Sequence, residues 1–262
     1  MYFSAGAFIL AYSFVFGLIA GSFLNVCIYR IPKKLSIVWP GSSCTQCGTK
    51  IKWYDNIPLL SWLLLRGKCR GCGAKISFQY PAVELFTAVI TVLFVHKYGL
   101  GLWAPCALFA VYCLIILSVI DMRLMIIPDR FSIGLIVYGL AVCFINPAFE
   151  GAAVARFLSS FGGACAGFFG MWAVALIGTF VFKKEAMGGG DVKLMGAIGA
   201  LSGVIGVVNA LIISSFAGIF YFGILVLLGK PLDNGTSIPF GPFLSVGLLF
   251  NLYFPAVIFS VL

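Results

Sequence analysis

The chain has 262 residues, of which 62% are hydrophobic and 10% are charged. Soluble domains carry about 25% charged residues, so this composition excludes a soluble globular protein and predicts a polytopic membrane protein. The formal net charge is +9, but nine of the 17 basic residues lie between positions 30 and 80, beside a single acid, Asp55. This clustering is typical of a cytoplasmic loop, and we expect no nucleic-acid partner.

The first apolar segment, residues 8–28, is long enough to cross a bilayer as a helix. Because no short apolar region with a small-residue cleavage site stands out, we expect a retained anchor and not a removed signal peptide. Gly17 and Gly21 share one face of this segment, a spacing that permits close helix packing. Ser22 and Asn25 also share a face, and hydrogen bonds to other helices are their simplest role.

Residues 30–80 are the only sizeable polar segment, and we expect them to form a cytoplasmic insert. They hold two Cys-x-x-Cys motifs separated by 21 residues, Cys44/Cys47 and Cys69/Cys72. Tetrahedral zinc takes four thiolates, and each motif turns two of them toward one point, so the pattern predicts a structural zinc site. Disulfides are the alternative, which the reducing cytoplasm disfavours. Four cysteines leave no open position on the metal, so we expect no catalytic zinc.

The apolar part of residues 51–67, between the two motifs, is too short to span a bilayer. Trp53, Tyr54, Trp62 and the flanking basic residues are typical of a membrane interface. We therefore expect this segment to lie on the bilayer surface, where anionic lipid would attract the basic side chains.

Seven further apolar segments follow the insert and predict an all-α protein with about eight transmembrane helices. The three predicted parts are residues 1–29 as the first helix, residues 30–80 as the insert, and residues 81–262 as a seven-helix core. With the N-terminus outside, 15 of the 17 basic residues would lie in or beside the cytoplasm, including Lys184 and Lys230. This orientation also places Asp121 and Asp191 on the cytoplasmic side.

The predicted spans of the core, which are approximate, cover residues 81–95, 102–120, 131–144, 157–182, 192–207, 210–228, and the stretch from about residue 243 to the C-terminus.

Gly188, Gly189 and Gly190 form a break between two of these spans, directly before Asp191. Glycines propagate a helix poorly and let other backbone come close. An ionised Asp at the bilayer centre costs about 2.5–3.5 kcal/mol on insertion scales, so Asp191 is a candidate functional residue. Asp121, at the end of another span, is its predicted partner.

Two carboxylates held close together cannot both ionise cheaply, so one of them keeps a proton. The ionised carboxylate can deprotonate water while the protonated one polarises a peptide carbonyl, which is peptidase chemistry. Local ion pairs with Arg123 and Lys193 are one alternative, and an ion-coupled transporter is another. A third acid, Asp129, follows a proline and is alternatively the N-cap of the next helix.

Together these motifs resemble the type IV prepilin peptidases, which are GxGD-type aspartyl proteases of bacterial inner membranes. The resemblance covers nearly the whole chain, and its motifs appear in the same order: Gly21–Val26 with Arg30 and Pro32, Cys44/Cys47, Trp53–Pro58, Arg66–Cys72, Tyr80-Pro81-x-x-Glu84, Asp121 with Ile127–Asp129, Gly188–Lys193, and Pro239–Pro242.

The resemblance implies that Asp121 and Asp191 are the catalytic pair. It implies cleavage of a basic leader from prepilins or pseudopilins, after a glycine and on the cytoplasmic side, with residues 188–190 letting substrate backbone approach Asp191. It also implies methylation of the new N-terminus with S-adenosylmethionine. No GxGxxG motif supports a site for that cofactor, and no residue is assigned to it. The rival functions are a transporter with a regulatory zinc module and a non-catalytic pilus or secretion scaffold.

Overall fold

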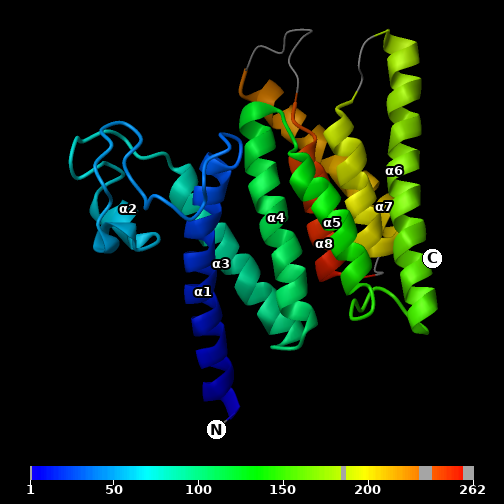
Figure 1. Ribbon diagram of the computed structural model, residues 1–262, viewed down its shortest axis with the longest axis horizontal. Coiled ribbons are helices and arrows are strands. Elements are labelled where there is room, and N and C mark those ends of the chain that lie inside the picture. The colour runs from blue at the N-terminus through cyan, green and yellow to red at the C-terminus, as the bar shows by residue number, and fades with distance from the viewer. Residues whose placement is uncertain (1, 184–186, 230–237, 256–262) are drawn as a thin grey trace. The chain divides into compact units, whose positions relative to one another are not determined.

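The long apolar segments of the sequence form long α-helices, as Figure 1 shows for the computed structural model. The structure describes residues 2–183, 187–229 and 238–255. Lys184, Lys230 and the end of the last predicted span lie outside these residues. The chain divides into two compact units, Met1–Ile116 and Leu117–Leu262, and α4 contributes residues to both.

The first unit contains two long helices, a small insert with little regular structure, and the greater part of α4. Its elements are α1 (Tyr2–Arg30), the 3-10 helix η1 (Trp53–Asn56), α2 (Leu60–Leu64), α3 (Gln79–Tyr98) and α4 (Trp103–Leu124). In the insert, two isolated antiparallel bridges pair Ser43 with Lys50 and Lys68 with Lys75.

The second unit is a helical bundle that begins with the last turns of α4. Its further elements are α5 (Asp129–Val142), α6 (Ala153–Phe182), α7 (Gly189–Leu227) and α8 (Gly241–Tyr253). The first half of α7 forms the centre of this bundle, because α5, α6 and α8 all pack against α7. Leu194, Met195 and Ile198 are fully buried there.

Among the described residues, five helices are long and apolar enough to cross a membrane: α1, α3, α4, α6 and α7. The structure therefore confirms an all-α, multi-pass architecture. α5 has 14 residues and α8 has 13, whereas a crossing needs roughly 20. The count of eight spans and the three-part domain division stay predictions.

α1 and α3 pack closely because glycines line their contact. A Cβ atom at Gly21 would lie 2.6 Å from the Cα of Glu84, and one at Gly17 would meet the backbone of Ala88. Asn25 Nδ2 donates a hydrogen bond to the carbonyl of Tyr80 at 3.0 Å. The predicted glycine packing and the hydrogen bonding of Asn25 to another helix are therefore both confirmed.

α7 is broken at Gly203, where φ is 70° and ψ is −175°. Freed carbonyl groups need partners inside a membrane. Ser160 Oγ donates to the carbonyl of Ala200 at 2.6 Å, and Asn146 Nδ2 donates to that of Leu201 at 2.8 Å. The predicted spans 192–207 and 210–228 are thus both parts of α7, and the backbone changes direction before the expected point.

Candidate active site and metal cluster

Asp121 lies near the end of α4, and only 5% of its surface is exposed. Its Oδ2 atom accepts a hydrogen bond from the backbone N–H of Gly241, the first residue of α8, at 3.0 Å. A Cβ atom at position 241 would lie 2.7 Å from the same oxygen, closer than such atoms approach. Glycine at this position therefore allows backbone to bind the carboxylate directly.

Asp191 is the third residue of α7, and Gly188 with extended backbone precedes the helix. Asp191 Oδ1 is buried and has no hydrogen-bond partner in the described part of the chain. The positive end of the helix dipole favours an anion at this position. A buried carboxylate oxygen without a partner is costly, so it calls for an explanation by function.

One side chain links the surroundings of the two acids. A Cβ atom at Gly190 would lie 2.8 Å from the Cβ of Ile127, and one at Gly241 would lie 3.1 Å from the Cδ1 of Ile127. The structure therefore brings the two predicted acids into one site, while their catalytic role stays a prediction.

The three glycines before Asp191 differ in their surroundings. Gly188 and Gly189 are exposed, and a Cβ atom at Gly189 would meet nothing within 4 Å. Gly190 instead packs against Ile127. The first two glycines thus leave their backbone exposed, and the third has a packing role.

The third acid, Asp129, pairs with Lys193 across two helices. Lys193 Nζ lies 2.7 Å from Asp129 Oδ1, and the two side chains are 33% and 58% exposed. The N-cap of α5 is Pro128, and no side chain caps this helix. The capping interpretation of Asp129 is therefore wrong, because its carboxylate turns to α7. Lys193 therefore does not form the local ion pair with Asp191 that was the alternative.

The four predicted metal ligands come together in the insert. The Sγ atoms of Cys44, Cys47, Cys69 and Cys72 all lie within 4.8 Å of one another, and those of Cys44 and Cys72 are 3.9 Å apart. A tetrahedron of Zn–S bonds of about 2.3 Å has edges of about 3.8 Å, so the cluster fits a metal ion of this size. Hydrogen bonding with the Thr49 hydroxyl lowers the pKa of the Cys47 thiol to about 6.

The two cysteine motifs have the same local geometry. The N–H of Gly48 donates to the carbonyl of Cys44 at 2.9 Å, and the N–H of Gly73 donates to that of Cys69 at 2.9 Å. Both glycines have positive φ values, 71° and 72°, which glycine adopts most readily. Each motif therefore closes a tight turn that holds its two sulfur atoms on one side.

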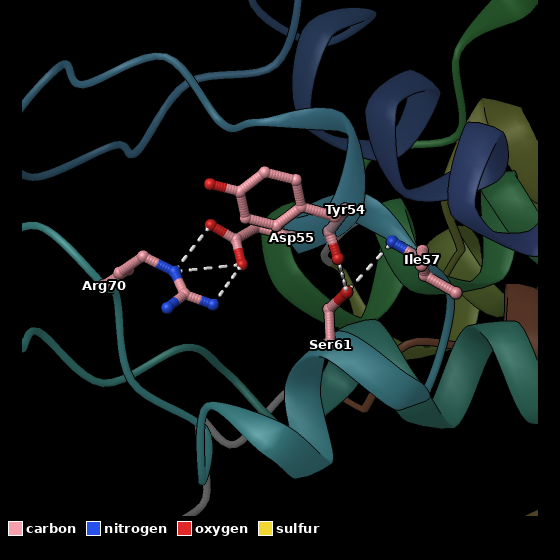
Figure 2. Close-up of polar contacts among 5 residues, drawn as sticks. All are labelled: Tyr54, Asp55, Ile57, Ser61 and Arg70. Atoms are coloured by element: carbon pink, nitrogen blue, oxygen red, sulfur yellow. Dashed lines mark hydrogen bonds and ion pairs between the residues drawn. The ribbon is translucent and has the colours of Figure 1, made fainter.

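The second motif is tied to the rest of the insert by a bidentate ion pair (Figure 2). Arg70 Nε and Nη2 donate to the carboxylate of Asp55 in η1, with the shortest contact at 2.7 Å. Hydrogen bonding to this guanidinium holds the pKa of Asp55 below its usual value. Nearby, Ser61 Oγ donates to the carbonyl of Tyr54 and accepts from the N–H of Ile57, each at 2.9 Å.

Two parts of the sequence match known families. Residues 15–98 match the bacterial peptidase A24 N-terminal domain, and residues 108–223 match the type IV leader peptidase family. A prepilin leader peptidase/N-methyltransferase of Xanthomonas campestris pv. campestris is 37% identical over 260 residues, covering 88% of this chain and 86% of the relative. This chain belongs to the type IV leader peptidase family.

Two further relatives have names that belong to the same family. The type 4 prepilin-like proteins leader peptide-processing enzyme of Escherichia coli is 36% identical over 259 residues, or 92% of each chain. The prepilin leader peptidase/N-methyltransferase of Myxococcus xanthus is 38% identical and matches 90% of this chain and 70% of the relative. No solved structure matches this leader peptidase. The transporter alternative gains no support from these relatives.

Sequence reasoning missed two contributors to the leader peptidase site, Gly241 and Ile127. Both stand in motifs quoted above for the resemblance, but neither was assigned a role. The only local signal for Gly241 is the Pro-Phe-Gly-Pro stretch before α8, because proline is favoured in the first turn of a helix. That signal predicts a helix start and not a carboxylate partner.

Proposed function

We propose that this leader peptidase is a membrane aspartyl endopeptidase that removes the basic leader of prepilins or pseudopilins, with Asp121 and Asp191 as its catalytic pair. The observation that carries this proposal is that one carboxyl is held by a backbone hydrogen bond, whereas the other keeps a buried oxygen without a partner. Asp121 is held at Oδ2 by the N–H of Gly241, and the buried Oδ1 of Asp191 has no partner among the described residues.

In the proposed mechanism the two carboxyls share one proton. The ionised carboxyl takes a proton from water as the water oxygen bonds to the peptide carbon, and the protonated carboxyl gives its proton to the carbonyl oxygen. The C–N bond then breaks as the leaving nitrogen receives the proton taken from water. One hydroxyl of the tetrahedral diol returns its proton to the second carboxyl, which gives the product carboxyl and restores the shared proton. Asp191 Oδ1 is the oxygen best placed to hold that water, and the Gly241 hydrogen bond keeps the second carboxyl oriented.

The substrate in this proposal is a chain whose apolar helix lies in the membrane and whose leader faces the cytoplasm. Gly188 and Gly189 offer exposed backbone beside Asp191, where an extended peptide can approach without meeting side chains. The names of the relatives support prepilins as the substrates. The family resemblance supports placement in the bacterial inner membrane, and the distribution of basic residues supports an insert that faces the cytoplasm.

We also propose that the enzyme methylates the new N-terminus, with S-adenosylmethionine as the methyl donor. This proposal depends on the names of the relatives, which combine both activities. The described part of the chain contains no strand–turn–helix unit of the kind that holds this cofactor in dinucleotide-type folds. No residue of this chain is therefore assigned to the methyl donor.

For the insert we propose a structural zinc ion held by Cys44, Cys47, Cys69 and Cys72. Bound zinc would supply a cross-link between the two turns, and four thiolates would leave no position for water. The chain's own residues shape the site, because a backbone hydrogen bond closes each of the two turns.

The test is leader release by purified enzyme in lipid nanodiscs, followed by mass spectrometry with a prepilin substrate and S-adenosylmethionine. The double variant Asp121→Asn/Asp191→Asn serves as the blank for contaminating peptidases. We expect the wild type to yield a free leader and a methylated mature pilin. Failure of the wild type to release more leader than the blank would contradict the peptidase proposal.

A further inference from the structure

The short helix α2 carries three leucines on an exposed face. Leu60, Leu63 and Leu64 are 56%, 61% and 80% exposed, and their spacing places them on one side of the helix. Large apolar side chains that cluster on a surface mark a binding site for an apolar partner. α2 is not part of a membrane-spanning helix, so its partner must be identified from its position and its neighbours.

Contacts with α1 and α3 fix the position of α2 along these helices. The N–H of Leu59, directly before α2, donates to Glu84 Oε2 at 2.8 Å, and a Cβ atom at Gly21 of α1 would lie 2.6 Å from the Cα of Glu84. Glu84 is only 7% exposed. The entry to α2 is therefore anchored on the sides of α1 and α3 and not beyond their ends.

The helix rise converts these contacts into a depth. Glu84 lies five residues after Gln79, where α3 begins, and Gly21 lies nine residues before Arg30, where α1 ends. At 1.5 Å per residue these separations are about 8 Å and about 14 Å along the helix axes. In Figure 1, α2 accordingly lies at the level of the C-terminal half of α1.

That level coincides with the boundary between headgroups and acyl chains. Arg30 and its basic neighbours mark the polar end of α1, and a surface helix buries its apolar face about 5–10 Å into this boundary. Because α2 begins directly after Leu59, which is bound at Glu84, its exposed leucines start from a level about 8 Å below the beginning of α3, where acyl chains and not water are the expected surroundings. The position of α2 and its apolar side chains thus both favour lipid as the partner.

The basic residues beside α2 also favour a lipid partner. Lys52, Arg66 and Lys68 flank α2 and are exposed. The single acid of the insert, Asp55, is bound by Arg70 and leaves these charges uncompensated. A basic, leucine-bearing surface fits an anionic leaflet, to which polybasic segments beside a membrane helix are attracted.

We propose that α2 lies in the headgroup–acyl boundary of the leaflet next to the insert, with Leu60, Leu63 and Leu64 among acyl chains and the flanking basic residues on anionic headgroups. The lipid leaflet is the occupant of this face. Through the Asp55–Arg70 ion pair this contact also ties the second cysteine motif to the membrane surface. The proposal does not depend on the peptidase mechanism.

The experiment uses photo-crosslinking in the full-length protein. A benzophenone amino acid replaces Leu63, and a matched control carries it at Thr45, an exposed position in the first cysteine motif. Both proteins are reconstituted without substrate in nanodiscs that contain neutral and anionic phospholipids, irradiated, and analysed by mass spectrometry.

We expect the probe at position 63 to give phospholipid adducts several-fold above those at position 45. We also expect the anionic share of these adducts to fall in Arg66→Gln/Lys68→Gln. Adducts at position 63 no more frequent than at position 45 would overturn the proposal, and so would adducts mainly to a second copy of the chain. Equal wild-type and variant anionic shares would overturn the headgroup contact.

Discussion

Lys193 Nζ lies 2.7 Å from Asp129 Oδ1, so the ammonium group nearest in sequence to Asp191 is paired with a different carboxylate. The pair joins the first turn of α5 to the second turn of α7. Asp191, two residues away, keeps a buried oxygen free of any partner among the described residues. The three acids therefore have distinct environments, which predict distinct responses to mutation.

Lys193→Gln removes the ion pair with Asp129. Because both side chains are partly exposed to solvent, the pair contributes at most about 1 kcal/mol to the free energy of unfolding. We expect the rate of leader cleavage to stay within about fivefold of the wild type, the factor that corresponds to this energy. Steady-state cleavage rates check this expectation, and a loss of a hundredfold would show that Lys193 acts on the dyad.

Gly241→Ala places a Cβ atom 2.7 Å from Asp121 Oδ2, so the carboxylate must move and its hydrogen bond is lost. Misplacing a catalytic group by about 1 Å can cost about 10²-fold in rate, and we expect a loss of that order. Gly134→Ala in α5 is the control, because a Cβ atom there would meet nothing within 4 Å. Equal cleavage rates for the two variants would refute the role of Gly241.

Gly163→Ala tests the contact between α6 and α7. A Cβ atom at this position would collide with the Gly199 carbonyl and lie 2.7 Å from the Gly203 Cα. Overpacking of this kind costs about 1–3 kcal/mol, so we expect a lower Tm in detergent. The adjacent Gly162→Ala is a matched control with open space around its new Cβ atom. Indistinguishable melting curves would argue against close packing at this contact.

Cys47→Ser removes one of the four clustered thiols. We expect loss of bound zinc and faster proteolysis of residues 51–67, because metal binding and folding of such a site are coupled. A strong chelator should have the same effect on the wild type, and Cys165→Ser in α6 should have none. Elemental analysis and limited proteolysis measure both properties. Full protease resistance of the metal-free insert would contradict a structural role for the metal.

The main features of the site could be predicted from the sequence because they depend on residue type and local spacing. Four cysteines in two motifs, and two acids at the ends of apolar segments, are visible without a structure. Gly17 and Gly21 of α1 predicted close packing for the same reason, since small residues at this spacing let membrane helices approach each other.

The remaining features depend on contacts between distant positions. The hydrogen bond from Gly241 to Asp121 joins residues 120 positions apart and uses a backbone group that every residue except proline carries. Asp129 has a partner 64 positions away, whereas the local pattern suggested a cap. The break at Gly203 lies within an unbroken apolar stretch, and the side chains that satisfy its carbonyls come from outside α7.

The assignment of the catalytic pair is tested most directly by the rates of leader cleavage in three variants, Asp121→Asn, Asp191→Asn and Asp129→Asn. Each variant is purified in nanodiscs and matched for thermal stability. Positioned acid–base groups contribute about 10²–10⁴-fold, and we expect losses of at least this size for the first two variants. Asp129→Asn should cleave within about fivefold of the wild type, since its ion pair is exposed. Near-wild-type cleavage by either of the first two variants would contradict the assignment of the catalytic pair.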